Sequence, residues 1–388
     1  MTHHALIVRL AALALACVAG ASDPAWAQTF ETAGREAIVI DVDTGAVLFE
    51  KDADKRMPPA SMSKVMTTYM VYQLMRENRV KPDDIFSVSE NAWRKGGAKS
   101  GGSTMFLNLG SRAKVEDLLR GVVIQSGNDA CIVLAEGLAA SERAFAEEMT
   151  ALGRKIGLRD SNFVNTTGWP DPDHYMTARD LATLSVRLIR DFPEHYKVYA
   201  ERSFTYNGIT QGNRNPLLYK DLGVDGIKTG HTQESGYSLA ASAKRGERRL
   251  VTVVTGLKSM NERSRETERI LEWGFREFNN YALFKAGEKI ADAEVWLGVG
   301  PKVPLVIGDN VTLTMPRSAR KDMKVKYSYR GPIAAPIAKG QPVAKLTISV
   351  PGRPPMEHVL VAGEGVAALG LTGRLKAAFR HILWGEAG

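Results

Sequence analysis

Residues 58–67 read PPASMSKVMT, with a serine and a lysine three positions apart just after two prolines. The prolines mark a break, after which a helical pattern runs from about Ser61 to Glu77. Residues three apart share one face of a helix, so the Lys64 amine is expected beside the Ser61 hydroxyl. Such a hydroxyl needs an adjacent base, and lysine serves only when burial or nearby positive charge lowers its pKa. Alone the pattern is weak, because a serine after prolines often merely caps a helix.

Two later motifs supply the other parts of a hydrolytic site. Ser126-Gly127-Asn128 is predicted on a loop between helices, where a hydroxyl can relay a proton and an amide can hold a substrate amide. Lys228-Thr229-Gly230-His231 comes at the end of a short strand predicted over Asp225–Thr229. Its ammonium and hydroxyl can bind a carboxylate, and its glycine lets a substrate backbone approach the strand. Taken singly, each is an ordinary turn or strand edge.

The surrounding pattern predicts an α/β (α+β) domain. The first and last strands are expected to share an antiparallel sheet, and the middle helices to form a separate cluster. Thr177 with Asp180 resembles a capping box that opens the last of these middle helices. The expected strands are 37–42, 47–50, 225–229, 237–243 and 249–255, and the expected helices are 115–123, 130–139, 141–156, 178–190 and 261–278.

Beyond Leu283 apolar residues alternate with polar ones, which predicts a small all-β, sandwich-like domain over residues 283–368. Residues 369–388 form a basic amphipathic helix with Leu371, Leu375, Phe379 and Ile382 at helical spacing. We expect this helix to lie in an anionic membrane surface, the alternative being a helix packed on the β domain.

The N-terminus indicates export. Ala5–Gly20 is strongly apolar and Ala25-Trp26-Ala27 has the small residues of a cleavage site, so residues 1–27 are predicted to be a signal peptide. Lipid attachment at Cys17 is the alternative. The remaining Cys131 is expected to be a small buried apolar residue. A net charge of +8 favours anionic partners, although no aromatic-basic module indicates nucleic acid. No metal-ligand spacing is present.

In order, S-x-x-K, S-x-N and K-T-G make the triple of the penicillin-recognising serine enzymes. The residues around these motifs resemble those of the D-alanyl-D-alanine carboxypeptidases among the low-molecular-mass penicillin-binding proteins. The likeness covers about Ala37 to Tyr281 and, more loosely, the β domain and terminal helix. It implies a β-lactamase/transpeptidase-like domain over residues 28–282. The segments that carry it are Pro59–Thr67, Ser103–Leu107, Gln125–Cys131, Asn213–Leu218 and Lys228–Thr232.

The resemblance also implies roles. Ser61 would attack the bond between two terminal D-alanines of a peptidoglycan stem peptide, and Lys64 would take its proton. Ser126 with Lys228 would pass a proton to the leaving D-alanine. Asn128 would bind the acyl side chain of the substrate. Lys228, Thr229 and Gly230 would bind its carboxylate end. The backbone N–H groups of Ser61 and His231 would form the oxyanion hole. Arg214 would assist with the carboxylate or be a surface arginine. β-Lactams would inhibit, and the enzyme would work on the periplasmic face of the cytoplasmic membrane.

Three other functions stay open. A serine β-lactamase needs a glutamate in an E-x-x-L-N context after the second motif, and no such segment lies between Asn128 and Lys228. A non-catalytic penicillin-binding scaffold is disfavoured by the intact triple. A D,D-endopeptidase would use the same site, so the sequence does not separate it from a carboxypeptidase.

Overall fold

The computed structural model describes residues 30–384, and the predicted signal peptide and Cys17 lie outside them. Five antiparallel strands form the central sheet in the order β2-β1-β9-β8-β7, so the first and last strands of the domain meet as predicted. The strands of this sheet are β1 (Ala37–Asp41), β2 (Val47–Lys51), β7 (Val224–Thr232), β8 (Gly236–Arg245) and β9 (Arg248–Leu257).

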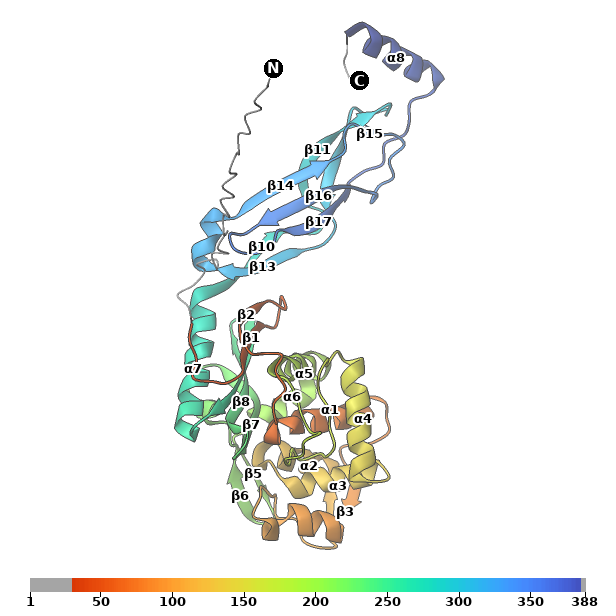
Figure 1. Ribbon diagram of the computed structural model, residues 1–388. Coiled ribbons are helices and arrows are strands. Elements are labelled where there is room, and N and C mark those ends of the chain that lie inside the picture. Colours follow the sequence, from red (N-terminus) through yellow and green to blue (C-terminus); the bar gives the residue numbers. More distant parts are fainter. Residues whose placement is uncertain (1–29, 385–388) are drawn as a thin grey trace, which may run out of the picture.

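The sheet is covered on both faces, which explains the unbroken apolar runs in its central strands. In β9, Leu250 and Val254 pack with the final helix, whereas Val251 and Val253 belong to the core of the helical cluster. The cluster contains α1 (Lys64–Arg76), α2 (Val115–Arg120), α3 (Asn128–Leu138), α4 (Glu142–Lys155), α5 (Ala178–Asp191) and α6 (Pro193–Tyr196), and α7 (Met260–Glu277) covers the other face. Figure 1 shows α7 along one side of the sheet and the cluster on the other.

Several helix ends follow the predicted chemistry. The Ser141 side chain accepts a hydrogen bond from Ala144 N and caps α4, and the Thr177 side chain accepts from Asp180 N and caps α5. The reciprocal half of the capping box was wrongly predicted, because the Asp180 carboxylate instead accepts from Arg159 N, Asp160 N and Ser161 Oγ. Aspartate is one methylene shorter than the usual glutamate, and here it ties down the loop before α5.

The sequence did not predict two small two-stranded sheets. β3 (Ile85–Ser87) pairs with β4 (Arg112–Lys114), and β5 (Ser203–Tyr206) pairs with β6 (Ile209–Gly212). The second has a readable signal, since Asn207-Gly208 sits between alternating residues and both have positive φ. Its Gln211 amide donates to Thr104 O at 3.0 Å, so this hairpin braces a loop beside the Ser126 motif.

The second unit is all-β, as expected. Its six-stranded sheet has the order β14-β16-β17-β12-β11-β15, and β10 pairs separately with β13. Its core contains Val303, Leu305, Leu346, Ile348 and Leu360, all buried. The strands are β10 (Phe278–Phe284), β11 (Lys289–Trp296), β12 (Lys302–Ile307), β13 (Val311–Pro316), β14 (Lys324–Tyr329), β15 (Ile333–Ala334), β16 (Pro342–Ser349) and β17 (Met356–Ala362).

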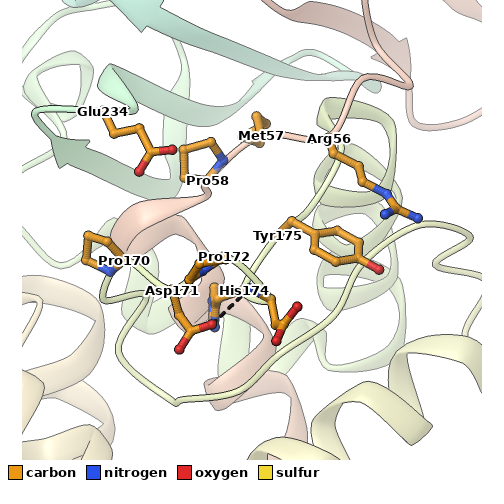
Figure 2. Close-up of a pocket in the computed structure, with 10 residues that line it drawn as sticks. Arg56, Met57, Pro58, Pro170, Asp171, Pro172, His174, Tyr175 and Glu234 are labelled. Carbon is orange, nitrogen blue, oxygen red and sulfur yellow. Dashed lines mark hydrogen bonds between the residues drawn. The ribbon is translucent and has the colours of Figure 1, made fainter.

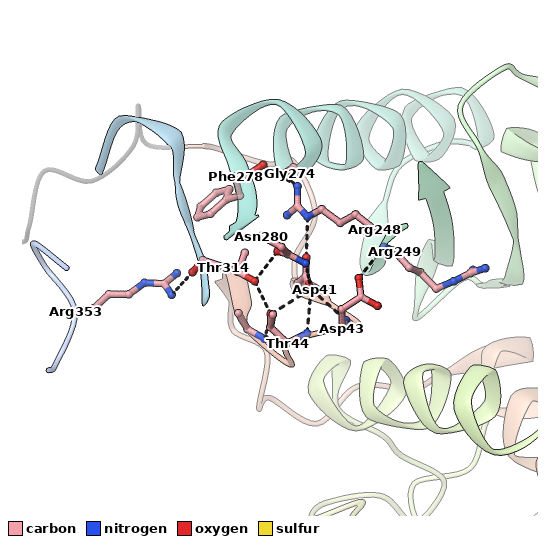
Figure 3. A network of polar contacts seen from close by, with 11 residues as sticks. Asp41, Asp43, Thr44, Arg248, Arg249, Gly274, Phe278, Asn280, Thr314 and Arg353 are labelled. Carbon is pink, nitrogen blue, oxygen red and sulfur yellow. Dashed lines mark hydrogen bonds and ion pairs between the residues drawn. The ribbon is translucent and has the colours of Figure 1, made fainter. Parts of the chain in front are cut away.

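A polar network joins the two units where α7 runs into β10 (Figure 3). The fully buried Asp41 carboxylate accepts from Arg248 Nε at 2.8 Å and from Asn280 Nδ2 at 3.1 Å. Thr314 Oγ1 donates to Asn280 Oδ1 at 2.8 Å and lies 2.5 Å from Thr44 Oγ1. Because desolvated charges tolerate little displacement from their partners, this network fixes how the β domain leaves the sheet.

The last described element is α8 (Leu371–Trp384), at the far tip of the β domain (Figure 1). Leu371, Leu375, Phe379 and Ile382 lie within one arc of the helix and are 78%, 65%, 66% and 79% exposed. Within residues 30–384, no helix combines the length and apolar character needed to cross a bilayer.

Candidate active site

The nucleophile candidate sits on a tight turn. Residues Ala60–Ser63 form one 3-10 turn, α1 begins at Lys64, and Ser61 is half-buried. The fully buried Lys64 amine donates to Ser61 Oγ at 2.9 Å and also to the carbonyl of Thr167. Ser61 and Lys64 are therefore in direct contact, as helical spacing predicts.

Burial gives this amine the property that a base requires. Desolvation lowers the pKa of Lys64 to about 8, and the positive charge of Arg214 acts in the same direction. A buried environment disfavours the ammonium, because no solvent stabilises its charge. Lys64 therefore holds an appreciable fraction of neutral amine near neutral pH, which an exposed lysine does not.

The second motif lies at a helix start rather than wholly on a loop. Ser126 has left-handed φ of 61° at the end of a π-helical turn over Gly121–Gln125, and α3 begins at Asn128. The turn interrupts the helix predicted over 115–123. Ser126 Oγ accepts from Lys228 Nζ at 3.0 Å. The Asn128 side chain is buried, and its Nδ2 would lie 2.9 Å from a Cβ added to Gly102.

The third motif lies within β7, not at its end. The strand continues to Thr232, where the Thr232 and Ser235 side chains and main chain bond one another to close the turn into β8. Lys228 and Thr229 are 2% and 6% exposed. At Gly230 an added Cβ would meet Met62 Cγ and Pro59 O at 3.0 Å each, so the glycine lets β7 lie against the turn that carries Ser61.

These elements enclose a groove of about 680 Å³. Ser61, Ser126, Thr229, Gly230 and His231 line it together, although they are distant in sequence. The other lining residues are Gly101, Gly102, Ser103, Arg214, Tyr237, Met260 and Arg263. Lys64, Asn128 and Lys228 do not line it, and the two lysines reach its serines from beneath.

Two arginines line the groove, Arg214 from a loop and Arg263 from α7. Arg214 lies between Asn213 and Asn215, whose buried side chains bond neighbouring backbone, and its own guanidinium bonds Ser103 Oγ. Arg263 was missed by sequence reasoning, because a single arginine on a helix carries no motif. It is 6% exposed, and its guanidinium carbon lies 5.8 Å from the centre of the Tyr237 ring. Its Nε has no hydrogen-bond partner among residues 30–384.

The groove is electropositive. Lys64, Lys228, Arg214 and Arg263 surround it, and no carboxylate lines it within the part of the chain that the structure describes. Burial lowers the pKa of Lys228 well below its usual value, and the charges of Lys64 and Arg214 lower it further. Cationic groups held this closely favour an anionic ligand, which relieves their mutual repulsion.

A second hollow, of about 480 Å³, differs from the groove because carboxylates line it (Figure 2). These are Asp171, Asp173 and Glu234, and the guanidinium of Arg56 lies among the same lining residues. This hollow shares no lining residue with the groove. The preference for anions is therefore a property of the groove and not of this whole face.

Cys131 is fully buried in the core of the helical cluster, as predicted, and burial raises the pKa of its thiol to about 12. A thiol in this state packs as a small apolar group and is not a nucleophile.

Comparison with known proteins identifies the family. The family model for D-alanyl-D-alanine carboxypeptidase, peptidase family S11, matches residues 21–259, and the penicillin-binding protein 5 C-terminal domain model matches residues 278–368. D-alanyl-D-alanine carboxypeptidase DacC of Escherichia coli K12 is 40% identical over 354 residues, which are 90% of this chain and 88% of that protein. DacA of the same strain is 38% identical over 351 residues, 89% and 87% of the two chains.

Solved structures agree. Penicillin-binding protein 5 of Haemophilus influenzae matches with a TM-score of 0.77 at 34% identity, covering 88% of this chain and 99% of that one. Ampicillin-bound penicillin-binding protein D2 of Listeria monocytogenes matches with a TM-score of 0.56 at 28% identity, covering 64% and 100%. With the groove and its serine–lysine contacts, these likenesses show that the chain belongs to the S11 D-alanyl-D-alanine carboxypeptidases, serine hydrolases of the penicillin-binding protein family.

Proposed function

We propose that Ser61 attacks the carbonyl between the two terminal D-alanines of a peptidoglycan stem peptide and forms an acyl-enzyme. The observation that carries this proposal is the 2.9 Å contact between Ser61 Oγ and the buried Lys64 amine. When Lys64 is neutral, its lone pair takes the Ser61 proton as the C–O bond forms. Water then hydrolyses the ester and releases the shortened peptide.

Ser126 delivers a proton to the leaving D-alanine. Its hydroxyl is bonded to Lys228 Nζ at 3.0 Å, so a proton given up by Ser126 is replaced from the ammonium. Ser126 lines the same groove as Ser61, so it lies on the path of the departing amine. The left-handed backbone at Ser126 turns the hydroxyl into the groove, away from the direction of α3.

The substrate's terminal carboxylate binds at the cationic end of the groove. Thr229 and Lys228 supply a hydroxyl and a charge from β7, Arg214 supplies a second charge, and Arg263 supplies a third from α7. Arg263 is the strongest candidate for direct contact, because its buried Nε has no partner within the described residues. A buried donor without an acceptor costs about 1–3 kcal/mol, which a bound carboxylate would recover.

The oxyanion is stabilised by the backbone N–H groups of Ser61 and His231. Gly230 supports this assignment, since it brings β7 to van der Waals distance from the Pro59–Met62 turn. Asn128 holds the acyl side chain from beside Gly102, which lines the groove and lies against the Asn128 amide. Backbone donors fixed in advance need no reorganisation when charge develops.

The test of the nucleophile is D-alanine release from a peptide ending in D-Ala-D-Ala, with Ser61→Ala as control. We expect release by the parent and none by the variant. Mass spectrometry after penicillin treatment should find a single adduct on the peptide that contains Ser61. Equal release by parent and Ser61→Ala, or an adduct elsewhere, refutes the assignment.

The carboxylate site has a matched control on its own helix. Arg263→Gln should raise KM for the D-Ala-D-Ala peptide by about tenfold or more, the usual scale for a charge-assisted hydrogen bond. Arg265 is exposed two residues away, and Arg265→Gln should leave KM unchanged. Equal KM values for Arg263→Gln and the parent would remove Arg263 from the binding site.

Sustained β-lactamase activity is not proposed. No glutamate lines the groove within the described residues, so no carboxylate there activates the deacylating water. Fast, continuing turnover of a chromogenic cephalosporin would contradict this. A non-catalytic scaffold is disfavoured by the buried Lys64, because an unused buried amine only destabilises a protein. Release of D-alanine from a cross-linked muropeptide dimer would reveal endopeptidase activity at the same site.

We further propose that the protein is exported and works on the periplasmic face of the cytoplasmic membrane, held there by α8. The support is the exposed apolar stripe of α8 with basic Arg374 and Lys376 on the same helix. Such a face binds anionic lipid by burying its apolar side chains and attracting headgroups to its positive charges.

Removal of residues 371–388 should move the protein from vesicles containing anionic lipid into the supernatant while D-alanine release persists. Replacing Leu375 and Phe379 by Gln should do the same without shortening the chain. Continued sedimentation of both variants with the vesicles would show that α8 is not the anchor.

A further inference from the structure

The Lys64 amine has a second contact that the chemistry above does not use. Its Nζ donates to the carbonyl of Thr167, which lies more than a hundred positions later in the chain. A neutral amine has two N–H groups and one lone pair. When one N–H is held by a carbonyl, rotation about the Cε–Nζ bond is restricted, and the direction of the lone pair is set.

One side chain, that of Asn165, bonds the groups on both sides of the Thr167 carbonyl and so fixes its direction. Asn165 Oδ1 accepts from Thr167 N at 3.1 Å, Thr167 Oγ1 at 3.2 Å and Gly168 N at 2.8 Å. The other end of the same amide donates from Nδ2 to the Trp169 carbonyl at 3.1 Å. Asn165 thus uses both ends of its amide to shape residues 165–169 and no part of it touches the groove lining.

The neighbouring contacts fix where this loop lies. Thr166 donates its N–H and hydroxyl to Glu142 Oε1, at 3.1 Å and 2.8 Å, and Thr67 Oγ1 donates to the Thr166 carbonyl at 2.8 Å. Gly168 has φ of 84° and lies so close to the Ser61 turn that an added Cβ would meet the Ala60 carbonyl at 1.9 Å. The loop is therefore pressed against α1, α4 and the nucleophile turn.

We propose that Asn165 is a positioning residue for the hydrolysis: it holds the Thr167 carbonyl where that carbonyl orients the Lys64 amine toward Ser61. The inference rests on the proposed role of Lys64 as the base. It adds that the direction of the Lys64 lone pair is set from the 165–169 loop and not by α1 alone. Asn165 acts through Lys64 and contacts no substrate.

The carbonyl also affects the charge state of Lys64. A carbonyl that accepts from the amine favours the ammonium, and so opposes burial. The other charged or titratable groups acting on Lys64 are Arg214, Cys131, Asp129 and Glu142, while Lys228 lies on β7 beside Ser126. Replacing Asn165 by an uncharged residue adds or removes no charge, so a shift in the pH profile of such a variant reports on the loop.

The experiment measures acylation by a fluorescent penicillin from pH 6 to 10 in the full chain and two variants. Asn165→Ala releases the carbonyl, so the plateau rate should fall by about 100-fold, the scale of a misplacement of about 1 Å. Its rising limb should move to lower pH. Asn165→Asp keeps an acceptor for all three donors but adds a negative charge, so its rising limb should move to higher pH.

A downward shift of the limb in the uncharged Asn165→Ala is what a merely structural role would not produce, whereas the upward shift in Asn165→Asp checks that position 165 is close enough to act on the Lys64 amine. Asn162→Ala is the matched control, because this asparagine is on the same loop but bonds only the Asp173 carbonyl with its side chain. It should keep the parent profile. If Asn165→Ala folds poorly, Asn165→Leu decides the question, because it is close to asparagine in size, has no acceptor and adds no charge, and it should show the same fall in plateau rate and the same downward shift of its limb.

A parent-like plateau rate and limb in Asn165→Ala, or in Asn165→Leu where the alanine variant does not fold, overturns the positioning role while the proposed function stands. A different failure marks the function itself: a parent that releases no D-alanine, or one that Ser61→Ala matches.

Discussion

The pH dependence of acylation follows from the environment of Lys64. Burial gives its amine a pKa of about 8, against 10.5 for an exposed lysine. At pH 7 about one Lys64 in ten is then neutral, whereas roughly one in three thousand would be neutral at the ordinary pKa. If the neutral amine is the base, burial raises the acylation rate at pH 7 by roughly 300-fold, or about 3 kcal/mol.

The second-order rate constant for acylation by a fluorescent penicillin should therefore rise with pH, with a midpoint near 8. Arg214→Gln removes a positive charge that lowers the pKa of Lys64, so the midpoint should move upward, while Arg214→Lys should leave it close to the parent value. Lys64→Arg, which cannot lose its proton, should lose acylation by about a thousandfold or more. A rate constant that is flat from pH 6 to 10, or a midpoint near 10.5, would refute the reasoning.

Three further outcomes are expected. Gly168→Ala should abolish penicillin labelling, because the added Cβ would lie 1.9 Å from the Ala60 carbonyl oxygen. The control Gly157→Ala also has positive φ but lies in open space, so it should label normally. Equal labelling of the two variants would contradict the packing argument. Asp41→Ala should lower the free energy of unfolding in urea by about 3–5 kcal/mol, because Arg248, whose side chain is 11% exposed, loses its carboxylate partner. A loss below about 1 kcal/mol would argue against this reasoning. Lys64→Met should be more stable than the parent by up to about 3 kcal/mol below pH 8. Between pH 8 and 10.5 the unfolded parent binds a proton that the folded parent does not, so the parent gains stability and the difference fades. A difference that stays constant from pH 7 to 10.5 would contradict this reasoning.

Local patterns predicted most of the elements. The capped starts of α4 and α5 and the strands of the second unit follow from periodicity and cap chemistry, which act over a few residues. The pairing of β1 with β9 was predicted from the order of strands and helices along the chain. One error came where a contact distant in sequence takes over. The Asp180 carboxylate accepts from residues 159–161, about twenty positions earlier. The end of β7 is a separate, local error, because the Thr232–Ser235 turn closes the strand three residues later than predicted.

The contacts of the active site also divide into those that local sequence predicts and those that it does not. Lys64 next to Ser61 is a matter of three residues along one turn, so the sequence alone determines that contact, and the order of the three motifs determines the family. Only tertiary structure decides that Ser126 bonds Lys228, that Arg263 faces the groove from α7, and that the Thr167 carbonyl reaches Lys64. The same holds for the low pKa of Lys64, because desolvation depends on every segment that packs around the amine, and no short stretch of sequence records which segments those are.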